Sequence, residues 1–148
     1  MCDLKDWAPA VSWVLVLWGW HRVTKENNKR ELRKEVKDRI DTVAKLLDSV
    51  EDDAIEYYRM DNSDESIRLA RKIKVNVASV GHHLNILTNI DDKYRCSHEL
   101  IALRKAVTGS DFDSAERAVR ELGDQIFTDI AAASVNVIRK LDRAYAGK

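Results

Sequence analysis

The sequence predicts an all-α protein in which a single N-terminal transmembrane helix precedes an antiparallel bundle of three long helices and one short helix. The chain of 148 residues contains only five Gly and one Pro, and the proline is Pro9. Residues 10–148 therefore lack the residue that most strongly breaks helices. From Val36 onward, apolar residues recur in steps of three and four, the spacing of one helix face. Residues 7–20 carry no charge, although 34% of the chain is charged.

The charge-free stretch WAPAVSWVLVLWGW, residues 7–20, predicts the membrane anchor. Its 14 residues span about 21 Å as a helix, whereas a bilayer core needs about 20 residues. Extension to residues 4–23 reaches that length, because Lys5 and Arg22 near the ends can extend their charges to the interface. Tryptophans near both ends suit the two interfacial belts of a bilayer. The expected anchor residues are Trp7, Trp13, Trp18 and Trp20.

Other roles for this stretch fit the sequence less well. A cleaved signal peptide begins with basic residues and ends in a small-x-small site, whereas this chain begins MCDLKD, with a net charge of −1. A helix lying in the membrane surface needs a polar face, and residues 7–20 are apolar on every side. A helix buried in the core or against a partner protein remains the alternative.

Basic residues predict the orientation of the anchor. Lys5 is the one basic residue before it, whereas Arg22, Lys25, Lys29 and Arg30 follow it closely. Cytoplasmic flanks of membrane helices are enriched in Lys and Arg. We therefore expect a single-pass protein of an inner or plasma membrane, with its N-terminus outside. Residues 1–25 form the anchor in this interpretation, and residues 26–148 form a cytoplasmic bundle.

The first long helix is expected to begin near residue 27 or earlier, and nothing in the sequence prevents its continuity with the anchor. Its apolar seam has a period of 3.5 residues, which suits packing against one other helix. That helix belongs either to this chain or to a second copy. The stretch MDNSDES ends the helix, and Asn62 with Glu65 predicts the N-cap and capping box of the next one. The seam residues are Val36, Ile40, Val43, Leu47 and Val50, continued by Ala54 and Tyr57.

Three more helices complete the expected bundle. Turn signals in NIDDKYRCS and TGSDFDS separate them, and Gly109 marks the second stop. We expect the last helix over about residues 113–145, with Gly123 inside it. The second helix has the stripe Ala70, Ile73, Val77, Val80, Leu84 and Leu87; the short helix has Leu100, Ile101, Leu103 and Val107; and the last has Ala115, Val119, Leu122, Ile126, Ile130, Ala133, Val137, Leu141 and Ala144.

Little in the sequence indicates catalysis. The net charge is zero, so we expect no nucleic-acid partner. The clustered soft-ligand residues are His82, His83, Cys96 and His98, and they lack the spacing of a zinc site. Residues 46–65 have a net charge of −7 and residues 66–74 a net charge of +4, which we interpret as a solvated helix–turn–helix. We predict no catalytic residue, no metal site and no cofactor.

The sequence thus favours a non-enzymatic, membrane-anchored bundle. Its expected partners are membrane lipid and either another protein or a second copy of itself, as in an adaptor, a regulator or a bacterial or phage exclusion factor. The first alternative is a soluble subunit of a larger assembly, with the Trp-rich helix buried against a partner. A metal-dependent enzyme is the second alternative.

Overall fold

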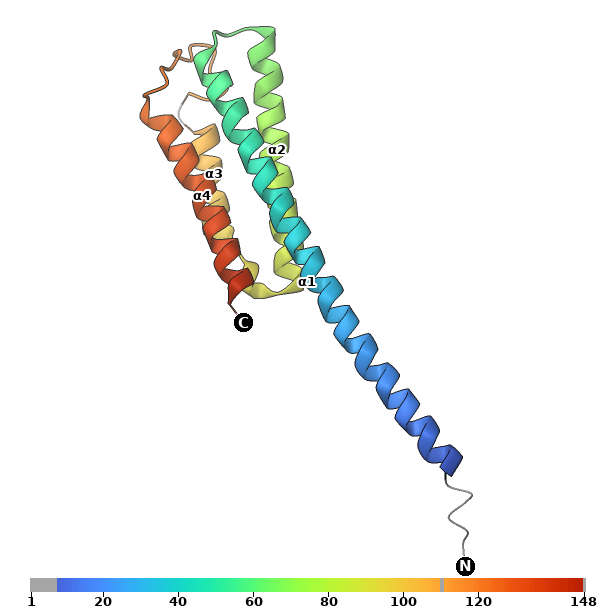
Figure 1. Cartoon of the computed structure of the whole chain (residues 1–148). Helices are drawn as coiled ribbons and strands as arrows, with labels where there is room; N and C mark the ends of the chain where they lie inside the picture. Colours follow the sequence, from blue (N-terminus) through green and yellow to red (C-terminus); the bar gives the residue numbers. More distant parts are fainter. Residues whose placement is uncertain (1–7, 110, 148) are drawn as a thin grey trace, which may run out of the picture. The chain divides into compact units, whose positions relative to one another are not determined.

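Figure 1 shows the computed structural model, which describes the backbone of residues 8–109 and 111–147 and the side chains of residues 26–109 and 111–147. The described residues form helices and contain no strand, so the predicted all-α class is confirmed. The elements are α1 (Ala8–Arg59), α2 (Asp64–Ile90), the 3-10 helix η1 (Asp92–Tyr94), α3 (Ser97–Thr108) and α4 (Gln125–Ala146). The predicted plan of three long helices and one short helix is also confirmed. The chain divides into two compact units, and the division falls between Lys37 and Asp38.

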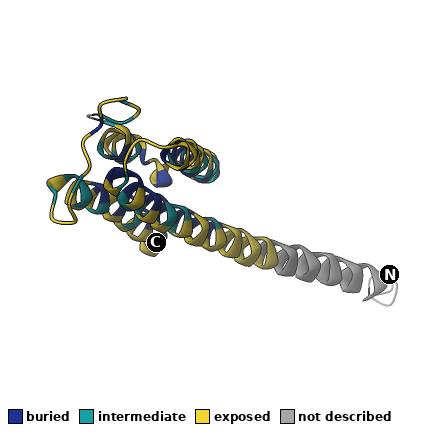
Figure 2. Cartoon of the chain, turned by 90° about the horizontal axis from the view of Figure 1, so that it is seen from above, coloured by how far each residue is buried: buried dark blue, intermediate teal, exposed yellow. Residues whose placement is uncertain are grey.

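Helix α1 runs without a break for 52 residues, through Asn27 and Asn28. Pro9 stands in its first turn, where a missing backbone N–H breaks no helical hydrogen bond. Residues 26–35 are exposed on every face of the helix, and burial begins at Val36, which is 4% exposed. Figure 2 shows this change from exposed to buried along α1.

Residues 38–109 and 111–147 form an antiparallel bundle. Lys72 Nζ of α2 lies 2.7 Å from Asp53 Oδ1 of α1, and Asn76 Nδ2 donates to Ser49 Oγ over 3.2 Å. Residue numbers rise along one helix as they fall along the other, so α1 and α2 run in opposite directions. The buried apolar side chains of the helices are Ile40, Val43, Leu47, Val50, Ala54, Tyr57 and Tyr58 on α1; Ala70, Ile73, Val77, Val80, Leu84 and Leu87 on α2; Leu103 and Val107 on α3; and Ile130, Ala133, Val137 and Leu141 on α4.

The start of α2 differs from the prediction that Asn62 and Glu65 cap it. Ser63 is the N-cap, and its hydroxyl accepts from the backbone N–H of Ser66 over 3.3 Å. The Ser66 hydroxyl accepts from the Ser63 N–H over 3.0 Å, which completes a capping box one residue later than predicted. Asn62 instead contacts the 111–124 segment, because its side-chain amide donates to the carbonyl of Ala115.

The last helix begins at Gln125, so the prediction of a helix from about residue 113 is wrong. Residues 111–124 are irregular, and Asp113 has a φ of 63°, in the left-handed region that a right-handed helix excludes. Gly123 lies outside the helix. Two residues of the predicted stripe, Val119 and Leu122, are 51% and 63% exposed.

The 111–124 segment packs on the C-terminal end of α1. The Arg120 N–H donates to the Tyr58 carbonyl over 2.7 Å, and the Arg117 guanidinium donates to the carbonyls of Tyr57 and Met60. The last carbonyls of a helix have no partner within it. These contacts with α1 replace the local hydrogen bonds that a helix over 113–124 would have made, which explains the late start of α4.

Candidate functional site

The residues predicted for the anchor lie mostly outside the described side chains. Trp7 lies outside the described residues altogether, and the side chains of Trp13, Trp18, Trp20, Arg22 and Lys25 are likewise not described. Lys29 and Arg30 are exposed on α1. None of the described helices contains an apolar stretch that qualifies as a membrane span.

The five seam residues of α1 are all buried. Val36 and Ile40 are nearly covered, and Val43, Leu47 and Val50 are at most 1% exposed. The four from Ile40 onward belong to the buried core of the bundle. The seam therefore contributes to the core of one molecule.

The clustered residues His82, His83, Cys96 and His98 belong to no group of metal ligands in the described part of the chain. Over the described residues there is no cluster of three or more His, Cys, Asp or Glu side chains that could hold a metal ion. Burial, and to a lesser extent the nearby Glu99, raises the pKa of the Cys96 thiol to about 11, against a small lowering by Lys140. The thiol is therefore protonated at neutral pH. Burial also lowers the pKa of His83, with His82 and Arg39 acting in the same direction.

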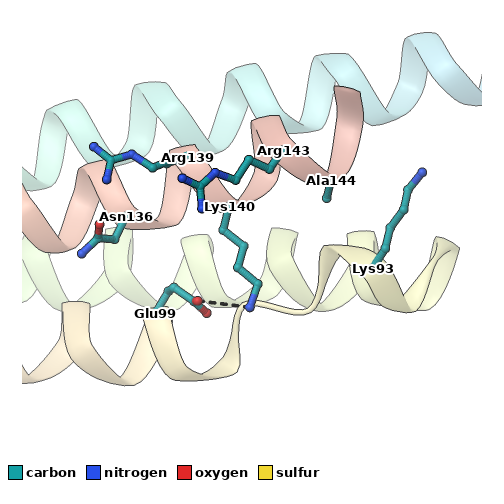
Figure 3. A pocket seen from close by; sticks show the side chains of 7 residues that line it. All are labelled: Lys93, Glu99, Asn136, Arg139, Lys140, Arg143 and Ala144. Carbon is teal, nitrogen blue, oxygen red and sulfur yellow. Dashed lines mark hydrogen bonds and ion pairs between the residues drawn. The ribbon is translucent and has the colours of Figure 1, made fainter. Parts of the chain in front are cut away.

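A basic pocket lies where η1, the first turn of α3 and the last turns of α4 come together (Figure 3). Its volume is about 530 Å³. Four of its seven lining residues are cationic and one is acidic, which gives the wall a net charge of +3. The basic pocket is lined by Lys93, Glu99, Asn136, Arg139, Lys140, Arg143 and Ala144.

Helix periodicity explains why α4 supplies most of this wall. Asn136, Arg139, Lys140 and Arg143 follow the spacing i, i+3, i+4 and i+7, so they share one face of the helix. The buried Val137 and Leu141 alternate with them and hold α4 in the bundle core. Packing of the apolar residues therefore determines where the polar stripe lies.

The single carboxylate of the pocket, that of Glu99, forms an ion pair with a cation of the same pocket. Lys140 Nζ reaches across from α4 to Glu99 Oε1 on α3, 3.1 Å away (Figure 3). Burial alone would raise the pKa of Glu99, but its own backbone N–H and Lys140 lower it below its ordinary value. Glu99 is thus ionised at neutral pH, and the Lys140–Glu99 pair contributes no net charge.

The other three cations of the pocket are less constrained. Lys93 Nζ lies 3.6 Å from Asp91 Oδ2 and 5.1 Å from the centroid of the Tyr94 ring. Arg139 and Arg143 are exposed, and among the described residues neither side chain forms an ion pair. The two guanidinium groups, one helical turn apart, can therefore bind an anion without breaking an existing ion pair.

The sequence interpretation missed this pocket because it followed only the apolar stripe of the last helix. The signal is the stripe N-x-x-R-K-x-x-R at residues 136–143. A basic helix face of this kind is usually solvated, so the stripe alone would not have distinguished a site from a surface. The distant Lys93 and Glu99 become neighbours of the stripe only through the fold.

Comparison with known proteins does not place the chain in a family. No family model, no curated protein and no solved structure matches it.

Proposed function

We propose that this chain is a single-pass, membrane-anchored helical bundle that acts by binding another protein or a second copy of itself, and that it performs no catalysis. The observation that supports this proposal most strongly is the run of 14 uncharged residues with four tryptophans at positions 7–20. Nine basic and five acidic residues follow over positions 22–45. This asymmetry favours an N-terminus outside an inner or plasma membrane and a bundle in the cytoplasm.

The energetics of residues 7–20 favour burial in a nonpolar environment. A buried tryptophan covers about 150–250 Å² of surface, so four of them in water represent a large unfavourable exposure. A helical conformation pairs the backbone N–H and C=O groups internally, as lipid requires. Helix α1 includes residues 8–20 and supports this part of the proposal. Lipid and a partner protein would both supply the nonpolar environment, so the test must separate them.

The non-catalytic part of the proposal rests on what the titratable side chains of the bundle do. Buried Asp53 pairs with Lys72, Asp111 pairs with Arg120 over 3.2 Å, and Glu99 pairs with Lys140. Cys96 is held in its protonated form by burial. The three ion pairs join neighbouring helices or hold the 111–124 segment, which is a structural role. Since the α1 seam from Ile40 to Val50 is buried within the bundle, association would use other surfaces.

Fractionation of the full chain in a bacterial host tests the anchor. We expect it to remain with membranes after alkaline carbonate and to need detergent for extraction. Deletion of residues 1–23 should release the bundle into the soluble fraction. Leu15→Arg combined with Leu17→Arg should do the same, because a charge at the centre of a membrane helix costs about 2.5–3.5 kcal/mol. The matched control is Leu32→Arg, at an exposed position of α1 outside the segment.

Protease added to intact spheroplasts tests the orientation. Protection of the bundle would support the cytoplasmic placement, and digestion from outside would invert it. A full-length chain that is soluble without detergent would overturn the membrane proposal in favour of the alternative. The Trp-rich helix would then be buried against a partner in a larger assembly.

A further inference from the structure

We propose that the basic pocket binds a phosphate monoester group. The pocket is lined by Lys93 of η1 and by Arg139, Lys140 and Arg143 of α4, and its volume is about 530 Å³. This inference concerns the bundle alone and does not depend on the N-terminal segment. Four of the residues that line this hollow are cationic and one is acidic.

The excess charge of the pocket is the first argument for an anionic ligand. Lys140 is neutralised by Glu99, whereas Arg139 and Arg143 have no ion pair among the described residues. Two unpaired guanidinium groups on one helix face repel each other. Arg143 lies in the last turn of α4, where its charge interacts favourably with the negative end of the helix dipole. Arg139 lies one turn earlier, where this interaction is weaker. The helix dipole therefore offsets only part of the repulsion between the two arginines, and an anion bound between them would offset the rest.

The geometry of the arginines is the second argument. Side chains at i and i+4 on a helix have Cβ atoms about 6 Å apart, so Arg139 and Arg143 can contact the same small group. Each planar guanidinium can donate two parallel hydrogen bonds to two oxygens of one anion. A phosphate group presents three terminal oxygens, which suits two such donors. The Asn136 amide lies on the same face and adds a neutral donor.

Charge and volume distinguish among classes of anion. A phosphate monoester carries close to two negative charges at neutral pH, which compensates the +3 wall better than the single charge of a carboxylate does. Small-molecule pockets typically enclose about 300–1,000 Å³, so the pocket has room for the group esterified to the phosphate. A mostly charged wall does not suit an apolar ligand. The same chemistry occurs in a soluble phosphate ester and in the headgroup of phosphatidic acid.

The test is calorimetric titration of the full chain in neutral detergent with glycerol 3-phosphate. The pocket variant is Arg139→Gln combined with Arg143→Gln, which leaves the Lys140–Glu99 pair intact. The control is Arg68→Gln combined with Arg104→Gln, which removes the same charge from exposed positions outside the pocket. We expect binding by the wild type to weaken at least about tenfold in the pocket variant, because two charge-assisted contacts are lost, and less than about twofold in the control.

A second titration distinguishes the source of the phosphate. Dioctanoyl phosphatidic acid and dioctanoyl phosphatidylserine are added to the same protein in the same detergent. Tight binding of both phosphate monoesters, lost in the pocket variant, would support a site for the phosphate group in any context. Binding of phosphatidic acid alone, also lost in the pocket variant, would support the proposal and assign the site to a lipid headgroup.

Three results would overturn the proposal. One is the absence of binding by both phosphate monoesters, and another is equal weakening in the pocket and control variants. The third is equal binding of phosphatidylserine and phosphatidic acid, which would reduce the pocket to a general anionic surface. Circular dichroism melting verifies that each variant is folded, and the single substitution Arg143→Gln replaces the double variant if that one does not fold.

Discussion

Arg117 is the side chain that joins the 111–124 segment to the end of α1. It is 7% exposed, and its guanidinium lies 4.0 Å from the centroid of the Tyr57 ring. The same group donates to the carbonyls of Tyr57 and Met60. A cation at a helix C-terminus also interacts favourably with the helix dipole. Arg117 thus satisfies one carbonyl in the last turn of α1 and one just beyond the helix, and so joins two parts of the chain about 60 positions apart.

We expect Arg117→Ala to lower the free energy of unfolding by about 2–4 kcal/mol, because it removes charged hydrogen bonds and a cation–π contact at a buried position. Urea denaturation of the full chain followed by circular dichroism measures this change. Arg68→Ala on the exposed face of α2 is the control and should change stability by no more than about 0.5 kcal/mol. Equal losses for the two variants would contradict the proposed role of Arg117.

Asp111 makes stability depend on acid pH. Burial alone would raise its pKa, but the backbone N–H groups of Ala118 and of Asp111 itself, together with Arg120, lower it overall. A carboxyl whose pKa is lower in the folded state stabilises the fold above its unfolded pKa of about 3.9. That stabilisation is lost as the pH falls through the lower folded pKa.

Asp111→Asn should therefore lower stability at pH 7 by about 1 kcal/mol, with a smaller difference from wild type below about pH 3. Urea midpoints at pH 7, 5 and 3 measure the trend. Asp61→Asn serves as the control, because Asp61 is exposed before α2. A difference from wild type that stays constant with pH would rule out a titrating role for Asp111.

At the scale of elements, side-chain contacts decide where helices begin. Several polar residues in MDNSDES are good N-caps, and local preference alone does not separate Asn62 from Ser63. Asn62 is held by the 111–124 segment through Ala115 and Arg117, so Ser63 caps α2. The choice between neighbouring caps therefore follows from a contact with a distant segment.

Ser63→Ala should destabilise the protein by about 1 kcal/mol, the usual cost of losing an N-cap side chain. Glu65→Gln, at the predicted capping-box position, should cost no more than about 0.5 kcal/mol through its weaker interaction with the helix dipole. Thermal melting of the two variants side by side measures both effects. A larger loss for Glu65→Gln would restore the sequence-based capping box and contradict the observed one.

Between α1 and α2, a polar network accompanies the apolar core. Asp53 is 6% exposed and accepts from Lys72 and Asn76, with Ser49 beside it. A buried carboxylate is costly unless it is paired, so a shift of one helix along the other would leave Asp53 without partners. The network thereby favours one register of the two helices, which apolar residues alone would specify less sharply.

At the scale of the whole molecule, α1 is one continuous helix with an exposed part and a buried part. Residues 26–35 are exposed all round, whereas Val43, Val50 and Ala54 are completely buried. Backbone hydrogen bonds open more readily where few apolar contacts hold the helix. The two parts of one helix should therefore differ strongly in local stability.

Hydrogen–deuterium exchange of the full chain tests this difference. Amides of residues 28–34 should exchange at least about 100-fold faster than those of residues 43–56, which open only when the bundle unfolds. Peptide-level mass spectrometry resolves the two stretches. Equal protection of both would show that another molecule covers residues 26–35, and dilution of the protein would then reveal whether a second copy is the cover.

The sequence by itself was sufficient for the helical class, for the continuity of α1 and for the core stripe of α2, because helix periodicity and the scarcity of Pro and Gly are local properties. Burial of the α1 seam was also visible in its 3.5-residue period. The membrane anchor stays a prediction, since it rests on residues that lie largely outside the described side chains.

Tertiary structure decided the features that depend on distant residues. Helix α4 begins only at Gln125 because Arg117 contacts Tyr57, which lies 60 positions earlier in the chain, and Arg120 contacts Tyr58. The basic pocket required Lys93 and Glu99 to lie beside the stripe of α4. Such contacts form only when a favourable interaction offsets the entropy of closing a long loop, and a local sequence pattern contains no information about which distant group will supply it.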